Sequence, residues 1–121
     1  MIILVLKLKV SPSDRKDVIS IFDTVAGSTS VKPGCKMVKL ESDVHDDDDL
    51  FLIEEWETMP DLEKYIASDE FRKIMAIIDM AFEPPEISFH SVSTTMGFEL
   101  VEKIRESVNS QYFNNSFNKA Y

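Results

Sequence analysis

The sequence is poor in cysteine, glycine and basic residues, and the shortages of cysteine and of basic residues each exclude a class of protein. Cys35 is the only cysteine among 121 residues, so the chain can form neither an internal disulfide nor a zinc site built from several thiolates. We expect Cys35 to pack as a small hydrophobic side chain. Lys and Arg number 13 against 22 Asp and Glu, which gives a net charge of −9. This charge disfavours binding to nucleic acid or to an anionic membrane surface, since both need basic side chains.

Long hydrophobic segments are also missing. The N-terminal apolar run, residues 1–6, is far too short to span a bilayer, and it lacks the basic leader and the cleavage site of a signal peptide. Hydrophobic residues make up 44% and charged residues 29%, which is ordinary for a folded globular protein. We therefore expect a single cytoplasmic domain with neither a membrane nor a nucleic acid partner.

The order of the predicted elements indicates an α+β fold. A strand over residues 2–9 precedes a helix that Ser11 and Pro12 can start as N-cap and first helical residue. Two strands, at 36–40 and 50–56, then flank a hairpin loop. Two helices follow, one at 60–66 and one from 69 to the prolines at 84 and 85. We expect the fourth strand at 87–95 and the last helix at 97–108. The order βαββαβ predicts a ferredoxin-like sandwich with an extra C-terminal helix.

We divide the chain into a ferredoxin-like domain at 1–95, a C-terminal helix at 96–108 and a flexible tail at 109–121, which is rich in Asn and Ser. Ile2 to Leu6 and Leu50 to Ile53 are apolar on both faces of their strands, so both faces of the sheet should be covered. The chain has no second layer of helices for this purpose. The sequence therefore predicts a homodimer in which the open sheet face meets a second copy.

Trp56 ends the third predicted strand, just before a helix, and is the most informative residue of the chain. Its ring either belongs to the core or forms the wall of a pocket between sheet and helix. Glu54 lies two residues earlier and therefore on the same face of the strand. It could act as a base with a raised pKa, or it could pair with a Lys or Arg across the sheet, and we favour the pair because buried acids usually have partners.

Tyr65 and His90 complete the set of candidate site residues. Tyr65 follows Leu62 by three positions, which places it near the helix face that meets the sheet, where its hydroxyl could bind a substrate oxygen. The alternative is an amphipathic side chain with a solvated tip. His90 is a second candidate base, because it titrates near neutral pH, or else a structural histidine. A pocket should lie between the sheet and the helices around residues 61–80, lined by Trp56 and Tyr65 with Glu54 as a further candidate.

The acidic segment Asp43 to Asp49 suggests a metal site at first sight. It has neither the glycine hinge nor the distal bidentate glutamate of an EF-hand loop, and four adjacent carboxylates cannot all face one ion. We interpret the segment as a solvated hairpin loop and predict no metal site.

Three short motifs give the chain a resemblance to a known family. Lys32 to Cys35 before the second strand, Glu55 and Trp56 at the end of the third, and Asp69 to Phe71 at a helix start resemble the antibiotic biosynthesis monooxygenase family over residues 1–95. The resemblance implies a dimeric α/β barrel built from ferredoxin-like units. It also implies, for the oxygenases of the family, a reaction of dioxygen with an electron-rich phenol or quinol, without metal or flavin.

Two positions depart from the family pattern. Tyr65 stands where the family typically has a histidine, and Lys7 and Lys9 are the polar residues of the first strand where the haem-degrading branch needs an asparagine. The resemblance therefore does not imply haem breakdown. It predicts a cofactor-independent monooxygenase of a small aromatic, with Trp56, Tyr65, Glu54 and His90 as candidate catalytic residues. The alternative is a non-catalytic dimeric barrel that binds a small metabolite, or a diverged member of another activity.

Overall fold

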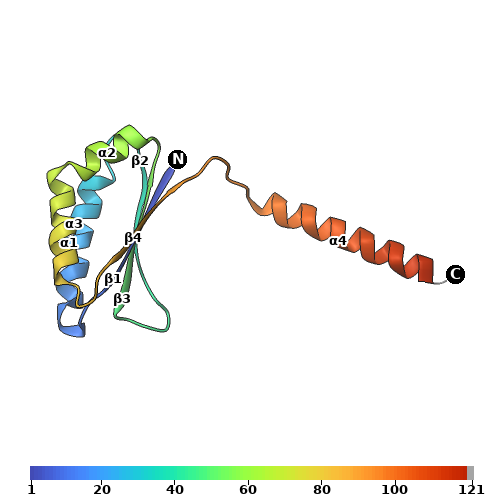
Figure 1. Cartoon of the computed structure of the whole chain (residues 1–121), viewed down its shortest axis with the longest axis horizontal. Helices are drawn as coiled ribbons and strands as arrows, with labels where there is room; N and C mark the ends of the chain where they lie inside the picture. Colours follow the sequence, from blue (N-terminus) through green and yellow to red (C-terminus); the bar gives the residue numbers. More distant parts are fainter. Residues whose placement is uncertain (120–121) are drawn as a thin grey trace.

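A computed structural model describes the backbone of residues 1–119 and the side chains of residues 1–110. Four strands and four helices follow one another along the chain (Figure 1): β1 (Ile2–Lys9), α1 (Pro12–Thr29), β2 (Cys35–Ser42), β3 (Asp49–Trp56), α2 (Met59–Ile66), α3 (Asp69–Met80), β4 (Glu86–Ser91) and α4 (Phe98–Lys119). The α+β, ferredoxin-like fold predicted from the sequence is confirmed.

The strands form one antiparallel sheet in the order β2-β3-β1-β4. The register places Leu4 of β1 and Val38 of β2 opposite Glu54, and it places Ile2 and Cys35 opposite Trp56. Residues directly opposite one another share a face of the sheet. The end of β3 is therefore enclosed between two neighbouring strands, which keeps the side chains of Glu54 and Trp56 within the sheet's central part.

Local sequence signals start the helices. Pro12 is the first residue of α1 and Asp14 lies in its first turn, where its charge faces the positive end of the helix dipole. The Thr58 side chain caps α2 by accepting a hydrogen bond from the Asp61 amide at 3.3 Å. Gly34, with φ of 83°, turns the chain into β2. A Cβ there would collide with the Asp61 side chain, so this turn fixes α2 against the start of β2.

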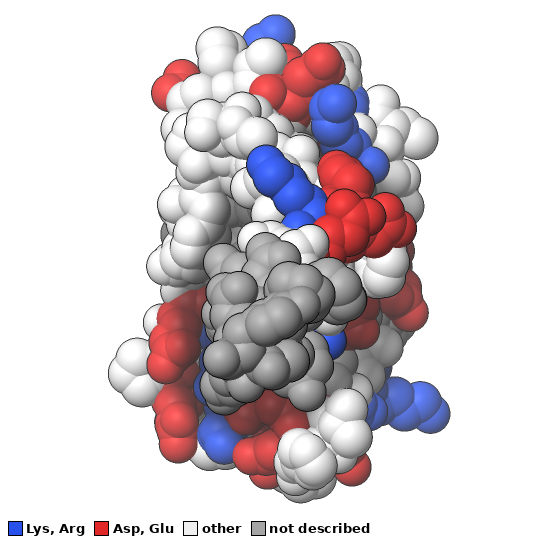
Figure 2. Space-filling model, turned by 90° about the vertical axis from the view of Figure 1, so that its right-hand side faces the viewer, with Lys and Arg blue, Asp and Glu red and all other residues white. Residues whose placement is uncertain are grey.

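The two faces of the sheet differ in what covers them. Helices α1, α2 and α3 lie on one face (Figure 1), and the even-numbered residues of β1 and β3 are buried there with the inner faces of the helices. On the other face the side chains of Ile3, Val5, Phe51 and Ile53 remain partly exposed. Figure 2 is viewed from this side and shows uncharged surface between groups of acidic and basic side chains. The apolar strands predicted on both faces are thus present, and the described residues cover one face only.

The C-terminal part differs from the sequence prediction. Strand β4 ends at Ser91 instead of Thr95, and α4 continues to Lys119, beyond the predicted helix end at residue 108. Residues 98–119 contain neither glycine nor proline, and Asn and Ser lower helix propensity without ending a helix. Helix α4 projects away from the sheet (Figure 1), and its apolar side chains between residues 98 and 108 are exposed, Ile104 by 53%. No helix among the described residues is long and apolar enough to cross a membrane.

Candidate active site

The last three residues of β3 place a carboxyl group and an indole ring on the buried face of the sheet. The side chains of β3 alternate between the two faces, so Glu54 and Trp56 both point toward the helices while Glu55 points to the open face. Glu54 and Trp56 are both fully buried. The prediction that these two residues share a face is confirmed.

Helix α2 adds Tyr65 to this pair. The Tyr65 ring stacks on the Trp56 ring with their centroids 4.7 Å apart, and the Phe71 ring packs edge-on against Tyr65 at 5.4 Å. Leu62, one turn earlier on α2, is buried as well, which confirms the predicted inner face of this helix. Offset stacking of aromatic rings stabilises such a pair beyond the burial of area, so both rings are held in fixed positions.

Glu54 connects the two rings through hydrogen bonds. The Tyr65 hydroxyl donates to Glu54 Oε2 at 2.7 Å, and the Trp56 indole Nε1 donates to Glu54 Oε1 at 3.2 Å. Each carboxyl oxygen thus has one neutral donor, and no cation pairs with Glu54 among the described residues. The ion pair that we favoured from the sequence is therefore wrong. Two aromatic donors take the place of the Lys or Arg.

Burial sets the proton affinity of the network. Loss of hydration raises the pKa of the Glu54 carboxyl, and the hydrogen bonds from Tyr65 and Trp56 oppose this shift. The pKa of Tyr65 is also raised, first by burial and then by the negative charge of Glu54, while the Thr29 hydroxyl acts in the opposite direction. Cys35, half-buried opposite Trp56, has a raised pKa from burial and from Glu54, which does not favour a reactive thiolate.

The raised pKa of Glu54 makes a prediction about stability and pH. A carboxyl group with a higher pKa in the folded than in the unfolded chain stabilises the fold fully below its unfolded pKa, near 4.5, and this stabilisation is lost as the pH rises through the folded-state pKa. We expect the free energy of unfolding of the wild type, minus that of Glu54→Gln, to fall as the pH rises above about 4.5. Guanidinium titrations of both proteins across pH 4 to 8 measure this difference. A difference that stays constant or rises would contradict a raised pKa.

A cavity of about 140 Å³ lies beside the two stacked rings. Trp56 and Tyr65 form its inner wall, and Lys32, Pro33, Asp61 and Lys64 form the rest of its lining. Glu54 lies behind the rings and does not line it. The cavity thus lies where the sequence predicts a pocket, at the end of β3 where α2 meets the sheet. Trp56 is at once a core residue and a pocket wall, so the two readings of this residue do not exclude each other.

His90 lies apart from this cavity. It stands opposite Ile3 in the register of β4 and β1, so its side chain points to the open face, away from Glu54. The ring is exposed and its Nε2 is 2.9 Å from the Ser88 hydroxyl. Within one chain the structure therefore brings together Trp56, Tyr65 and Glu54, but not His90. Sequence reasoning missed Lys32, Asp61 and Lys64 as site residues. Lys32 belongs to a family motif but had no predicted role, and the three side chains meet only because the turn before β2 packs on α2.

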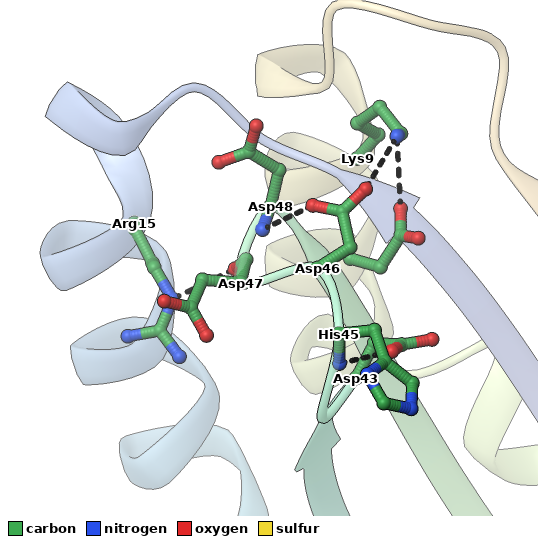
Figure 3. A network of polar contacts seen from close by, with 8 residues as sticks. Lys9, Arg15, Asp43, His45, Asp46, Asp47 and Asp48 are labelled. Carbon is green, nitrogen blue, oxygen red and sulfur yellow. Dashed lines mark hydrogen bonds and ion pairs between the residues drawn. The ribbon is translucent and has the colours of Figure 1, made fainter.

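Two carboxylates of the acidic loop between β2 and β3, those of Asp43 and Asp46, accept hydrogen bonds from neighbouring groups (Figure 3). Asp46 accepts hydrogen bonds from Lys9 Nζ at 3.1 Å and from the Asp48 amide at 3.0 Å, and Arg15 Nε donates to the Asp47 carbonyl oxygen at 2.9 Å. The Asp43 carboxylate accepts from the His45 amide at 2.7 Å. No group of three or more His, Cys, Asp or Glu side chains in the described residues is arranged to hold a metal ion.

Comparisons with known proteins agree with this fold. A family model described as antibiotic biosynthesis monooxygenase matches residues 1–77. A conserved protein of Methanosarcina mazei Go1 is 22% identical over 74% of this chain and 89% of its own, with a TM-score of 0.70. The structure of an antibiotic biosynthesis monooxygenase is 19% identical over 78% of this chain and 100% of its own, with a TM-score of 0.70. A Mycobacterium tuberculosis protein is 13% identical over 79% of this chain and 98% of its own, with a TM-score of 0.71. No curated protein matches the chain.

Proposed function

Because the chain belongs to the antibiotic biosynthesis monooxygenase family, we propose that it is a cofactor-independent monooxygenase acting on a small phenol or quinol. The observation that supports this most is the pairing of Tyr65 with the buried carboxyl of Glu54 at the wall of a cavity. This arrangement can remove a proton from a hydroxyl group bound in the cavity. A phenolate or quinol anion is the form of such substrates that reacts with dioxygen.

Tyr65 is the proposed catalytic residue, and Glu54 acts through it. The Tyr65 hydroxyl donates its own proton to Glu54, so its oxygen can accept a hydrogen bond from a substrate hydroxyl. When the substrate ionises, its proton passes to Tyr65 as the proton of Tyr65 passes to Glu54. The raised pKa of Glu54 brings its basicity closer to that of a phenol, which lowers the cost of this transfer.

The reaction with dioxygen balances without an external reductant. A ring carbon of the phenolate forms a bond to dioxygen and gives a peroxide. The O–O bond then breaks, one oxygen stays on the ring as a quinone carbonyl, and the other leaves as water with the hydroxyl and ring protons. The substrate loses four electrons and dioxygen gains four. Trp56 and Tyr65 would hold the flat ring against the inner wall of the cavity.

His90 has no part in the proposed proton transfer, because it lies on the opposite face of the sheet from Glu54. His90 lies on the open face, where we also propose that a second copy of the chain binds to form a homodimer. Partly exposed apolar side chains of β1 and β3 support a second copy on this face. A single cysteine fits a reducing compartment, so we place the proposed activity in the cytoplasm.

Replacing Tyr65 by Phe tests the proposed reaction. This change keeps the ring and removes the oxygen that accepts the substrate proton, so oxygen uptake should fall by about 10²- to 10⁴-fold, the usual contribution of a general base. An oxygen electrode with a panel of phenols and quinols measures the rate. The Glu54→Gln variant complements this change, because it keeps the size of the side chain and cannot take up the proton; its amide oxygen accepts from one of the two donors, Tyr65 or Trp56, and its NH2 group faces the other.

The wild type decides between the two function classes. If it consumes no oxygen with any compound of the panel, the oxygenase proposal fails and a non-catalytic binding protein is favoured. If it does and Tyr65→Phe matches it, the Tyr65 hydroxyl has a structural role only. A pH–rate profile that loses its acidic limb in Glu54→Gln would support proton uptake by Glu54.

A further inference from the structure

The size of the cavity suits a ligand with one aromatic ring. Its volume of about 140 Å³ is close to the roughly 150 Å³ of an apolar cavity that holds benzene. Pockets for drug-sized ligands have roughly 300 to 1,000 Å³. A single aromatic ring with small substituents therefore fills this volume.

The inner wall of the cavity offers the ligand no hydrogen-bond donor. Both polar groups of the stacked rings, the Trp56 indole Nε1 and the Tyr65 hydroxyl, already donate to Glu54. The Tyr65 oxygen retains acceptor capacity, which it shares between a ligand and the Thr29 hydroxyl, a buried group without another partner among residues 1–110. A ligand group that meets this wall must therefore be apolar or a donor, as a phenol hydroxyl is. An anionic group at the wall would find no donor and would lie near the Glu54 carboxyl.

The outer part of the lining has the opposite character. Two ammonium groups, those of Lys32 and Lys64, and one carboxylate, that of Asp61, line the cavity there. Lys32 pairs with Glu70 at 3.2 Å, and the Asp61 carboxylate accepts a hydrogen bond from the Thr58 hydroxyl at 2.8 Å. Lys64 has no ion pair in the described part of the chain. In a protein of net charge −9, this opening thus presents an uncommitted positive group.

We propose that the cavity takes a single-ring aromatic anion, a phenol that also carries a carboxylate, with its hydroxyl at Tyr65 and its carboxylate at Lys64. The hydroxyl end of this assignment rests on the proposed function, because it assumes a phenol substrate. The anionic end rests on the charges of the lining alone. Ring contact with Pro33 and the two aromatic side chains supplies the apolar part of the binding.

Fluorescence of Trp56, the only tryptophan of the chain, tests the proposal directly at the cavity wall. The probes are 2,5-dihydroxybenzoate and its neutral amide, 2,5-dihydroxybenzamide, titrated into the full chain under nitrogen so that no oxidation occurs, with calorimetry as a second readout. We expect the acid to bind about two- to fivefold more tightly than the amide, the usual scale for an exposed ion pair. Lys64→Gln should abolish this preference and leave the affinity of the amide unchanged.

The control is Lys73→Gln, which removes an equally exposed charge from α3, away from the cavity, and should keep the preference. Equal affinity for acid and amide, an unchanged preference in Lys64→Gln, or no binding of either probe would overturn the proposal. Its failure is distinguishable from that of the proposed function. If the protein consumes oxygen with neutral quinols but shows no preference for the acid, the proposal of an anionic ligand fails and the proposed function stands. If the acid binds tightly but no oxygen is consumed, the proposed function fails and the anionic ligand stands.

Discussion

Replacing Glu54 by Ala should cost the fold roughly 2 to 6 kcal/mol, because it leaves two buried donors, the Trp56 indole and the Tyr65 hydroxyl, each without an acceptor at about 1 to 3 kcal/mol. Domains of this size are stable by about 5 to 15 kcal/mol in total, so the variant should unfold at a much lower denaturant concentration. Guanidinium titration at 25 °C measures the loss. Wild type and variant have to be compared at one protein concentration, since dimerisation would add to the apparent stability.

Glu57→Ala is the matched control for this loss. Glu57 follows β3 directly and is exposed, so its removal should change the free energy of unfolding by no more than about 0.5 kcal/mol. The loss in Glu54→Ala should also depend on pH. It should be largest at acidic pH, because removal of the carboxyl near neutral pH also relieves the cost of its burial as an ion. Equal stability of the two variants would show that the hydrogen bonds to Glu54 do not hold the site together.

The strands and the inner helix faces could be predicted because period-two and helical spacing of apolar residues report burial directly. The same periodicities placed Glu54 beside Trp56 and turned Tyr65 toward the sheet with Leu62, and both placements are confirmed. Helix α4 was predicted too short. The sequence after Val108 is rich in Asn and Ser, and a helix without glycine or proline can continue through such residues.

The partners of Glu54 could not be predicted, because they depend on where α2 crosses the end of the sheet. This crossing is set by the Asp61 side chain against Gly34, a contact between residues 27 positions apart that no local pattern reveals. Buried acids are rare without a cation, which favoured an ion pair for Glu54. In the structure the Trp56 indole and the Tyr65 hydroxyl donate the hydrogen bonds that the buried carboxyl group requires. His90 was ambiguous for a similar reason, since only the register of β4 against β1 decides which face it occupies.

Ile53→Glu should convert the proposed homodimer into a monomer. Ile53 lies on the open face beside Val5, at the centre of the sheet, and an interface of obligate size there would bury on the order of 2,000 Å² or more in total. A carboxylate on this face loses hydration when a second copy covers it, a cost that Lys39, opposite Ile53 on β2, offsets only in part, and twofold symmetry introduces the charge twice. Sedimentation equilibrium at micromolar concentration should give a dimer mass for the wild type and a monomer mass for the variant, with circular dichroism confirming that the variant is folded.

Met75→Glu is the control. It makes a similar change from apolar to acidic on α3, where the side chain is 55% exposed on the opposite side of the sheet, and the variant should remain dimeric. A monomer mass for the wild type would reject the second copy, and a dimeric Ile53→Glu would place the contact elsewhere than on the open face.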